Sequence, residues 1–367
     1  MKPLNIAVIG QGRSGRDIHC ANLQFCKDIY NIVAVVDRRA DRRERAVREF
    51  GCEAYADYTE LFGRTDIDLV VNASYSQMHA PITLELLKHG FNVVCEKPFA
   101  QTAAEVDEMI AAERASGKRL FVFQQSRFAP YFEKIKEVIA SGKLGRIVQI
   151  SIAFSAFARR WDWQCVQGFT AGSLYNTGPH PLDQALRLLD VEGMPNVLCR
   201  MDRVNTYGDA EDYVKLILTA KDRPLIDIEI SSCDAYVDNV YKIHAEHGSL
   251  KGGADALKFK YFKPEEAPTQ NLVVTSLMND DGTPQYCGEK LTWYEEEWKP
   301  EEGNLFKAIT TQYYEKIYDT LVNGADFPIT LAQVRQQIAV IEECHRQNPL
   351  PAFVTAADQF DDGGGAQ

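Results

Sequence analysis

Residues 4–15 read LNIAVIGQGRSG, and this stretch decides the fold of the N-terminal part of the chain. It joins a strand-like run, LNIAVI, to glycines at positions Gly10, Gly12 and Gly15. In a strand-to-helix turn of this spacing, the first glycine permits the tight turn and the second lets a pyrophosphate approach the backbone. The third glycine lets the helix and the strand pack closely. The residues that follow are compatible with a helix, whose free N–H groups bind phosphate.

A second cofactor signal is Asp37, which ends the apolar run IVAVVD. A carboxylate at this position accepts hydrogen bonds from both hydroxyls of an adenosine ribose, which favours NAD. Arg38 and Arg39 follow directly, and guanidinium groups there are suited to the extra phosphate of NADP. A solvated, highly charged helix start is the alternative interpretation of these arginines. We therefore expect the three glycines, Arg13, Asp37 and Arg38 to bind NAD, with NADP as the alternative.

Five apolar runs up to Gln125 alternate with helical stretches: IAVIG, IVAVVD, DLVVNAS, FNVVCEK and LFVFQQ. Strands that are apolar on both faces and separated by helices form parallel sheets that are covered on both sides. This pattern predicts a doubly wound α/β domain over residues 1–126.

After residue 126 the strands become longer and more alternating, as in VQISIAFSAFA, VKLILTA, LIDIEISS and YKIHAEH. These segments predict an α+β domain over residues 127–355 with a mostly antiparallel sheet, one face of which is available to solvent or to another subunit. Helical patterns cover residues 181–189, 304–322 and 331–347. Residues 356–367 have the composition of a disordered tail.

Composition excludes some classes of partner. The 52 acidic residues exceed the 40 lysines and arginines, so the net charge of -12 argues against binding to nucleic acid or to an anionic membrane surface. The nine cysteines contain no C-x-x-C pair, which indicates reduced thiols in a cytoplasmic protein. No signal peptide pattern and no apolar run long enough to span a membrane occurs. No metal site is expected.

The run FNVVCEKPFA places Lys97 at the end of a predicted strand. In open parallel sheets ligands bind at the carboxyl ends of the strands, so Lys97 is expected to emerge at the site. Pro98 fixes the backbone directly after it. An ordinary surface lysine at a strand end is the alternative interpretation when this pair is taken alone.

Three stretches in this order and spacing resemble the Gfo/Idh/MocA family, which includes glucose-fructose oxidoreductase and inositol dehydrogenase. They are IAVIGQGRSGR, DLVVNASYSQMHAPITLELLKHGFNVVCEKPFA and GSLYNTGPHPLD. The resemblance covers nearly the whole chain and implies a Rossmann domain, a C-terminal domain with a large open sheet, and a nicotinamide between them. It implies that Glu96 lies near the nicotinamide ribose and that Lys97 touches the hydroxyl being oxidised. Ser74 and Tyr75 stand where the family commonly has a proline, in the loop to His79, and we expect Ser74 and His79 to contact the cofactor.

The stretch GSLYNTGPHPLD, residues 172–183, contains the remaining candidates for catalysis. Prolines are tolerated in a first helical turn, so a helix is predicted to begin here, with His180 and Asp183 on one face. The resemblance implies that His180 is the base or proton relay and that Lys97 stabilises alkoxide charge; a lysine base assisted by His180 is the alternative. Asp183 is expected to orient His180 or to bind a vicinal hydroxyl. Asn176 replaces the family's Asp and is expected to bind a sugar hydroxyl. A helix start with simple polar caps is the alternative interpretation.

The segment FARRWDWQ, residues 157–164, combines aromatic rings with charged and amide side chains, as sugar sites do. It predicts a carbohydrate or polyol substrate, although packing between the domains is an alternative role for its tryptophans. The residues expected to bind the substrate, besides Asn176, are Arg127, Arg160, Trp161, Trp163 and Tyr175.

These features favour an NAD(P)-dependent oxidoreductase that oxidises a secondary hydroxyl of a sugar, glycoside or cyclitol to a ketone by hydride transfer. Such a reaction needs a base within about 3 Å of the hydroxyl oxygen. Two alternatives are an NAD-dependent glycoside hydrolase that acts through transient oxidation and elimination, and a non-catalytic regulator that senses sugar or NAD. The open sheet face predicts a homo-oligomer.

Overall fold

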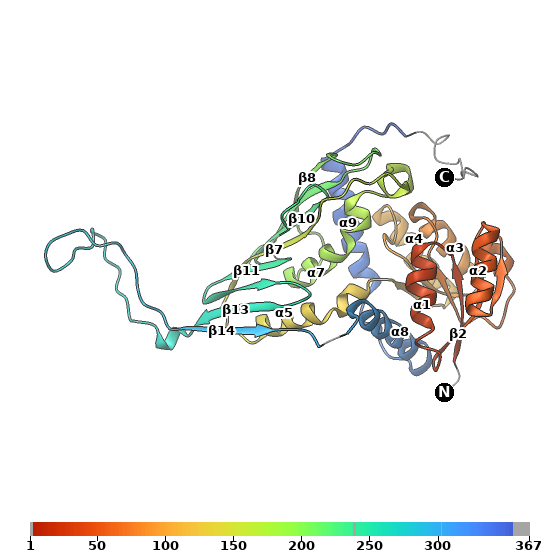
Figure 1. Ribbon diagram of the computed structural model, residues 1–367, viewed down its shortest axis with the longest axis horizontal. Helices are drawn as coiled ribbons and strands as arrows, with labels where there is room; N and C mark the ends of the chain where they lie inside the picture. The colour runs from red at the N-terminus through yellow and green to blue at the C-terminus, as the bar shows by residue number, and fades with distance from the viewer. Residues whose placement is uncertain (1–2, 238–239, 302, 355–367) are drawn as a thin grey trace.

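The computed structural model describes residues 3–237, 240–301 and 303–354. The chain forms a six-stranded sheet in the order β3-β2-β1-β4-β5-β6 and an eight-stranded sheet in the order β14-β13-β12-β11-β7-β10-β9-β8. Figure 1 shows the two sheets at opposite ends of an elongated body, with helices between them. The tail predicted at 356–367 lies outside the described residues.

The six-stranded sheet is parallel throughout and is covered by helices on both faces, which confirms the predicted doubly wound domain. Its central strands are buried on both faces, as their continuous apolar sequences require. Its edge strand β3 has only three residues and was too short to predict from alternation. The strands are β1 (Leu4–Ile9), β2 (Tyr30–Val36), β3 (Glu53–Tyr55), β4 (Leu69–Asn72), β5 (Asn92–Cys95) and β6 (Leu120–Val122).

The connections of this sheet are helical, and capping residues set their ends. The Thr102 side chain accepts a hydrogen bond from Glu105 N in a capping box, and Gly117 ends the same helix in a left-handed conformation. The segments are η1 (Arg13–Cys20), α1 (Ala21–Leu23), α2 (Ala40–Phe50), η2 (Tyr58–Leu61), η3 (Ser76–Met78), α3 (His79–Lys88), α4 (Ala103–Ser116) and η4 (Gln125–Phe128).

The eight-stranded sheet is mixed, because β7 and β10 are parallel while the other neighbouring pairs are antiparallel. One face packs on helices and buries alternate residues, for example Val214, Leu216 and Leu218 on β9. The edge strand β14 carries an acidic run, Glu295–Glu297, in its centre. The strands are β7 (Ile147–Ser155), β8 (Asn196–Asp202), β9 (Tyr213–Thr219), β10 (Leu225–Ser231), β11 (Tyr241–Ala245), β12 (Gly248–Gly252), β13 (Leu257–Phe262) and β14 (Trp293–Trp298).

The later helices connect the two sheets. Tyr30 Oη on β2 donates to the Tyr314 carbonyl at 2.7 Å, and Tyr313 Oη donates to the Val122 carbonyl at 2.7 Å. The N-terminal sheet is therefore packed against helices from the C-terminal end of the chain. These later segments are α5 (Pro130–Ala140), η5 (Trp163–Cys165), η6 (Gln167–Phe169), α6 (Ser173–Asn176), α7 (Pro179–Leu189), η7 (Pro264–Glu266), α8 (Leu305–Asn323) and α9 (Leu331–Gln347).

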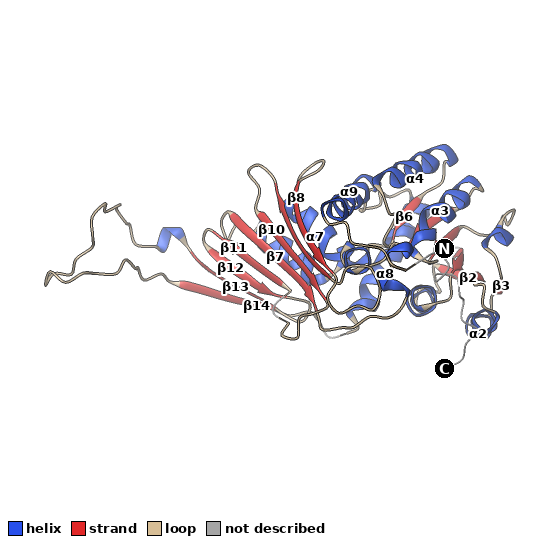
Figure 2. Cartoon of the chain, turned by 90° about the horizontal axis from the view of Figure 1, so that it is seen from above, coloured by secondary structure: helices blue, strands red, loops and turns tan. Residues whose placement is uncertain are grey.

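Residues 268–292, between β13 and β14, form a long excursion that we call the arm. It leaves the edge of the eight-stranded sheet and extends away from the body of the molecule (Figures 1 and 2). Its regular structure among the described residues is one bridge between Met278 and Pro284. None of the helices in the described residues is long and apolar enough to cross a bilayer.

Candidate functional site

The glycine turn follows β1 and leaves little room for side chains at two of its positions. Gly10 has φ +85°, and a Cβ atom there would lie 2.3 Å from the Ala73 carbonyl oxygen. A Cβ atom at Gly15 would lie 1.7 Å from the Gly10 carbonyl oxygen. At Gly12, by contrast, the nearest atom to a Cβ would be Arg42 Nη1 at 3.6 Å, so this side of the turn is open. The turn therefore fits a pyrophosphate that approaches the backbone at Gly12.

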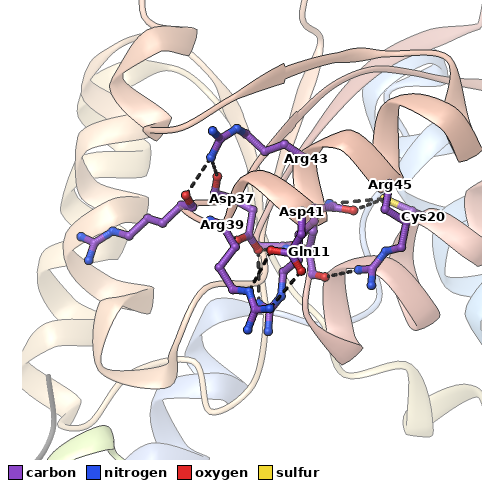
Figure 3. A network of polar contacts seen from close by, with 10 residues as sticks. Gln11, Cys20, Asp37, Arg39, Asp41, Arg43 and Arg45 are labelled. Atoms are coloured by element: carbon purple, nitrogen blue, oxygen red, sulfur yellow. Dashed lines mark hydrogen bonds and ion pairs between the residues drawn. The ribbon is translucent and has the colours of Figure 1, made fainter. Parts of the chain in front are cut away.

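Asp37 is fixed beside this turn by backbone N–H groups (Figure 3). Its Oδ2 accepts from Gln11 N at 2.7 Å, and its Oδ1 accepts from Arg39 N at 2.9 Å. Arg42 Nη1 approaches Oδ2 at 3.4 Å. The carboxylate thus joins the end of β2 to the glycine turn, which is the position that an adenosine ribose occupies in folds of this kind.

Several arginines surround the turn, but not all of them are free to bind phosphate. Arg39 forms an ion pair with Asp41 at 2.9 Å, and Arg45 Nη2 donates to the Gln11 carbonyl at 2.9 Å (Figure 3). The side chains of Arg13 and Arg38 are exposed. Both arginines considered for NADP are exposed, and of the two Arg39 is the one engaged by a carboxylate.

Lys97 lies at the carboxyl end of β5, as predicted, and reaches across to α6. Its Nζ donates to the Asn176 carbonyl at 3.0 Å. Burial lowers the pKa of Lys97, and the positive charges of Arg13 and Arg160 lower it further, against the opposing effect of Glu96. The structure thus brings the predicted lysine and Asn176 together, through the main chain of Asn176.

Glu96 belongs to a buried network that the sequence did not reveal. Its Oε1 lies 3.2 Å from His19 Nε2, and His19 Nδ1 lies 2.6 Å from Tyr314 Oη. Its Oε2 accepts from Lys97 N at 2.9 Å. Burial alone would raise the pKa of Glu96, but the hydrogen bond from His19 and the charges of His19 and Lys97 outweigh it and lower the pKa to about 2. An anionic Glu96 thus holds the backbone from which Lys97 emerges.

His180 lies in the first turn of α7, and its ring is held by a residue that sequence reasoning missed. Its Nδ1 lies 3.0 Å from Ser126 Oγ in η4. Burial and the charge of Lys97 lower the pKa of His180 to about 3, so the imidazole is neutral near neutral pH. Ser126 lies in η4 and directly follows the apolar run LFVFQQ, so its position at the end of a predicted strand was the available signal.

Asp183 and Arg127 are paired with each other. Asp183 Oδ2 accepts from Arg127 Nε at 2.8 Å, and Oδ1 accepts from Arg127 Nη2; both side chains are buried. Arg127 Nη1 also donates to Gln333. The prediction that Asp183 orients His180 is therefore wrong, because Asp183 is used by Arg127 and His180 is held by Ser126. The same pairing argues against the predicted contact of Arg127 with substrate.

Tyr175 is also held by contacts within the protein. Its hydroxyl donates to the Gln101 carbonyl at 2.9 Å, and its buried ring stacks on His345 with ring centroids 4.8 Å apart. This burial argues against the expectation that Tyr175 binds substrate. The neighbouring Asn176 donates from Nδ2 to the Gln164 carbonyl at 2.7 Å, which ties α6 to the segment 157–164.

The two tryptophans of that segment differ. Trp163 packs between Tyr75 and Phe169, with ring centroids 5.0 and 6.0 Å away. This cluster joins the loop after β4 to η5 and η6, as the packing alternative proposed. Trp161 is 80% exposed, and the neighbouring Arg160 lies 3.3 Å from Asp162.

His79 is buried and fixes the loop after β4. Its Nδ1 lies 2.6 Å from the Pro98 carbonyl, and its Nε2 lies 3.2 Å from the Ser74 carbonyl. Ser74 Oγ donates to Asn72 Oδ1 at 2.7 Å. His79 therefore couples this loop to the Lys97–Pro98 segment through main-chain oxygens.

A buried carboxyl group lies beneath α6. Glu211 Oε1 accepts from Leu174 N at 2.9 Å, and a Cβ atom at Gly172 would lie 2.4 Å from its carboxyl oxygens. Burial raises the pKa of Glu211 from 4.5 to about 8. Between these two values the folded chain binds one proton more than the unfolded chain, so this group's contribution to stability decreases as the pH rises.

Replacing Glu211 by Gln is expected to keep the acceptor for Leu174 N and to remove the titrating group. At about pH 8 the variant should therefore melt at least about 4 °C above the wild type, and at about pH 5 the two should melt together. Thermal unfolding at both pH values measures this difference. A Tm difference of equal size at both values would contradict it.

Comparison with known proteins gives consistent matches over most of the chain. Residues 4–124 match the family model described as the oxidoreductase family with an NAD-binding Rossmann fold, and residues 132–251 match the GFO/IDH/MocA C-terminal domain. The uncharacterized oxidoreductase YhhX of Escherichia coli is 26% identical over 96% of this chain and 99% of the relative. The scyllo-inositol 2-dehydrogenase (NADP(+)) IolW of Bacillus subtilis is 27% identical over 92% of each chain.

Solved structures show the same fold. The structure of YhhX has a TM-score of 0.76 at 22% identity and covers 96% of this chain and 99% of its own. The WlbA dehydrogenase from Bordetella pertussis, solved with NADH and UDP-GlcNAcA, has a TM-score of 0.73 at 18% identity and covers 94% and 95%. The glycine turn, the fixed Asp37 and both matched domains agree, and the chain is an NAD-binding oxidoreductase that belongs to the Gfo/Idh/MocA family.

Proposed function

We propose that this protein oxidises a secondary hydroxyl of a carbohydrate or cyclitol to a ketone. The observation that supports this most directly is a partly buried lysine whose charge reaches a neutral imidazole. Lys97 Nζ is held by the Asn176 carbonyl, and its charge acts on His180. The ammonium group is suited to stabilise the substrate oxygen as it becomes negatively charged, and the imidazole is suited to accept the hydroxyl proton.

In this proposal the chain's own residues bind the substrate oxygen, stabilise its charge and accept its proton. Bound NAD⁺ supplies the acceptor for the hydride. Lys97 binds the substrate oxygen and stabilises its alkoxide character. Ser126 orients the His180 ring, and with Nδ1–H directed at Ser126 Oγ, Nε2 is the nitrogen that takes the hydroxyl proton. A lysine base assisted by His180 is the alternative, since burial lowers the pKa of Lys97 as well.

The surroundings favour a sugar-like substrate. Trp161 is exposed in the segment 157–164, and Arg160 in the same segment is close enough for its charge to act on Lys97. An apolar ring face next to charged side chains suits a polyhydroxylated ring. The similar proteins include inositol 2-dehydrogenases, for example one from Salmonella typhimurium that is 27% identical over 69% of this chain. These observations support a sugar, glycoside or cyclitol as the substrate.

NAD is the cofactor that we propose as the preferred one. The fixed Asp37 carboxylate suits two free ribose hydroxyls and repels a phosphate, while Arg39 is engaged by Asp41. The ratio of kcat/KM with NAD to that with NADP measures this preference directly. A ratio below one would assign the exposed Arg38 to the phosphate of NADP.

The purified protein should be incubated with NAD and a panel of sugars, glycosides and inositols, while the absorbance of the reduced nicotinamide is followed. Reduction together with a keto product supports the proposal. Release of a free aglycone without net reduction would assign the transient-oxidation hydrolase instead. Absence of turnover with all compounds, together with NAD binding, would favour the sensing regulator.

The pH dependence of the reaction is expected to lack the usual histidine limb. Because the pKa of His180 is about 3, the imidazole stays competent to accept a proton down to about pH 5. His180→Asn should lower kcat/KM by about 10²-fold or more at every pH from about 5 to 8, without changing the shape of the profile. Parallel pH profiles of the two enzymes check this. An acid limb near pH 6.5 that disappears in the variant would show that His180 has an ordinary pKa.

A further inference from the structure

Four aromatic side chains are exposed near one end of the eight-stranded sheet, and we call them the aromatic rim. Phe157, Trp161, Tyr207 and Tyr236 are 59%, 80%, 60% and 93% exposed. Single exposed aromatic residues are ordinary on a protein surface, but a group of them marks a place where a ligand or a partner binds.

The strand register shows that these four residues belong to the same end of the sheet. Ser155 at the end of β7 pairs with Ser231 at the end of β10. Tyr213 at the start of β9 pairs with Ser231 on one side and with Asp202, the end of β8, on the other. Figure 1 shows β7, β10 and β8 side by side. The segments that follow these three strands therefore leave at one end, and they carry the aromatic rim.

Contacts between these segments hold the rim together. Tyr207 N donates to the Arg160 carbonyl at 2.9 Å, which joins the segment after β8 to the segment after β7. Phe157 forms an antiparallel bridge with Cys233, which joins the segment after β7 to the segment after β10. The segment after β7 is thus bound to both of its neighbours.

The rim borders the site around Lys97. The charge of Arg160 lowers the pKa of Lys97, so the two groups lie within electrostatic reach of each other, and Trp161 directly follows Arg160 in the chain. The Gln164 carbonyl accepts from Asn176 Nδ2 at 2.7 Å, and the Asn176 carbonyl holds Lys97 Nζ at 3.0 Å. A ligand bound beside Lys97 therefore has the rim as its nearest exposed aromatic surface.

Part of the rim is held rigid by an arginine. Arg159 Nη2 donates to Tyr207 Oη at 2.6 Å, and Arg159 Cζ lies 4.9 Å from the centroid of the Tyr207 ring. Guanidinium groups and aromatic rings both stack on the face of another aromatic ring. Because the two side chains are already fixed against each other, less conformational entropy is lost when a ring binds to them.

The carboxylates of the rim segments are occupied by contacts within the protein. Asp162 lies 3.3 Å from Arg160 Nε, and Asp234 Oδ1 accepts from Tyr236 N at 2.9 Å. Asp212 accepts from three backbone N–H groups. A second sugar ring needs acceptors for its hydroxyl groups, whereas an aromatic ring needs a flat apolar surface. The rim therefore favours an aromatic ring.

We propose that the aromatic rim binds the aromatic aglycone of a glycoside whose sugar ring occupies the site around Lys97. The aglycone stacks on the Arg159–Tyr207 pair and on Trp161, while the hydroxyl that is oxidised lies beside Lys97 and His180. This inference rests on the proposed function for the place of the sugar ring. It narrows the substrate class to aryl glycosides.

Isothermal titration calorimetry of the full chain saturated with NADH tests the proposal without turnover. The probes are matched pairs of phenyl and methyl glycosides of glucose, galactose, mannose and xylose, with the corresponding disaccharides as a third set. In at least one pair the phenyl glycoside should have a Kd about tenfold lower than the methyl glycoside. Equal Kd values in every pair, binding of no phenyl glycoside, or tighter binding of a disaccharide would overturn the proposal.

Variants of the rim locate the aglycone. Tyr207→Phe keeps the ring and should keep most of the preference for the phenyl glycoside, whereas Tyr207→Ala with Trp161→Ala should bring the ratio of the two Kd values to about one. Tyr286→Ala is the matched control, because it removes an exposed tyrosine of the arm, which leaves the sheet at the β14 edge, opposite β8 (Figure 1). A preference that persists in the double variant would show that the aglycone lies elsewhere.

Binding and turnover together separate this proposal from the proposed function. A preference for phenyl glycosides that is lost in the double variant, without oxidation of any glycoside, would support the rim and overturn the proposed oxidation. Oxidation of both members of a pair with equal Kd and equal kcat/KM would support the proposed function and overturn the rim.

Discussion

Replacing Lys97 by Met is expected to lower kcat for the preferred substrate by about 10³-fold or more while the Kd for NADH stays close to that of the wild type. The Lys97 ammonium group is the one predicted to stabilise the developing alkoxide, and methionine keeps the length of the side chain without its charge. Its anchor, the Asn176 carbonyl, belongs to the main chain and is present in the variant. Steady-state kinetics and a fluorescence titration with NADH measure the two quantities.

Lys88→Met is the matched control, since Lys88 is an exposed lysine at the end of α3 in the same domain. It should leave both quantities unchanged. Loss of kcat by less than tenfold in Lys97→Met would show that the lysine only holds the Lys97–Asn176 contact. Loss of NADH binding would instead place the lysine in the cofactor site.

The second large effect is on stability, and it concerns the Arg127–Asp183 pair. Arg127→Met leaves a buried carboxylate without its partner, and breaking such a pair typically costs about 3–5 kcal/mol. Since the pair is almost fully buried, we expect a decrease in Tm of roughly 10 °C. The double variant Arg127→Met with Asp183→Leu should be clearly more stable than the single one, because no unpaired charge remains.

Arg335→Met is the comparison for an exposed pair. Arg335 and Asp107 form a bidentate ion pair on the surface, so its loss should change Tm only slightly. The folded Arg127→Met protein should also keep its KM for substrate, measured at low temperature. A KM increase of tenfold or more without a decrease in Tm would restore Arg127 to the substrate site.

Local sequence signals predicted the parts of the site that local structure determines. The glycine turn, Asp37 after β2, Lys97 after β5 and His180 at the start of α7 each lie where their own segment places them. A strand end or a first helical turn fixes such positions within a few residues. The parallel sheet was predictable for the same reason, because each strand is a continuous apolar run.

Contacts between distant segments were not predictable in this way. His19, Glu96 and Tyr314 are far apart in the sequence and meet only in the folded chain. Asp183 was assigned to His180 because both lie on one helical face, yet Arg127 from η4 competes for its oxygens. Tyr175 neighbours Asn176 but points elsewhere, since successive residues of a helix differ in direction by about 100°.

The return of α8 and α9 to the first sheet has a consequence for synthesis on the ribosome. The parallel sheet ends at Val122, but its packing includes Tyr313 and Tyr314 of α8. About 200 further residues must therefore leave the exit tunnel before these contacts form, which takes on the order of 10–40 s at usual translation rates. During that interval the nascent sheet exposes an apolar surface that chaperones bind, so a translational pause before α8 emerges would lengthen this exposure, whereas a pause after it would not.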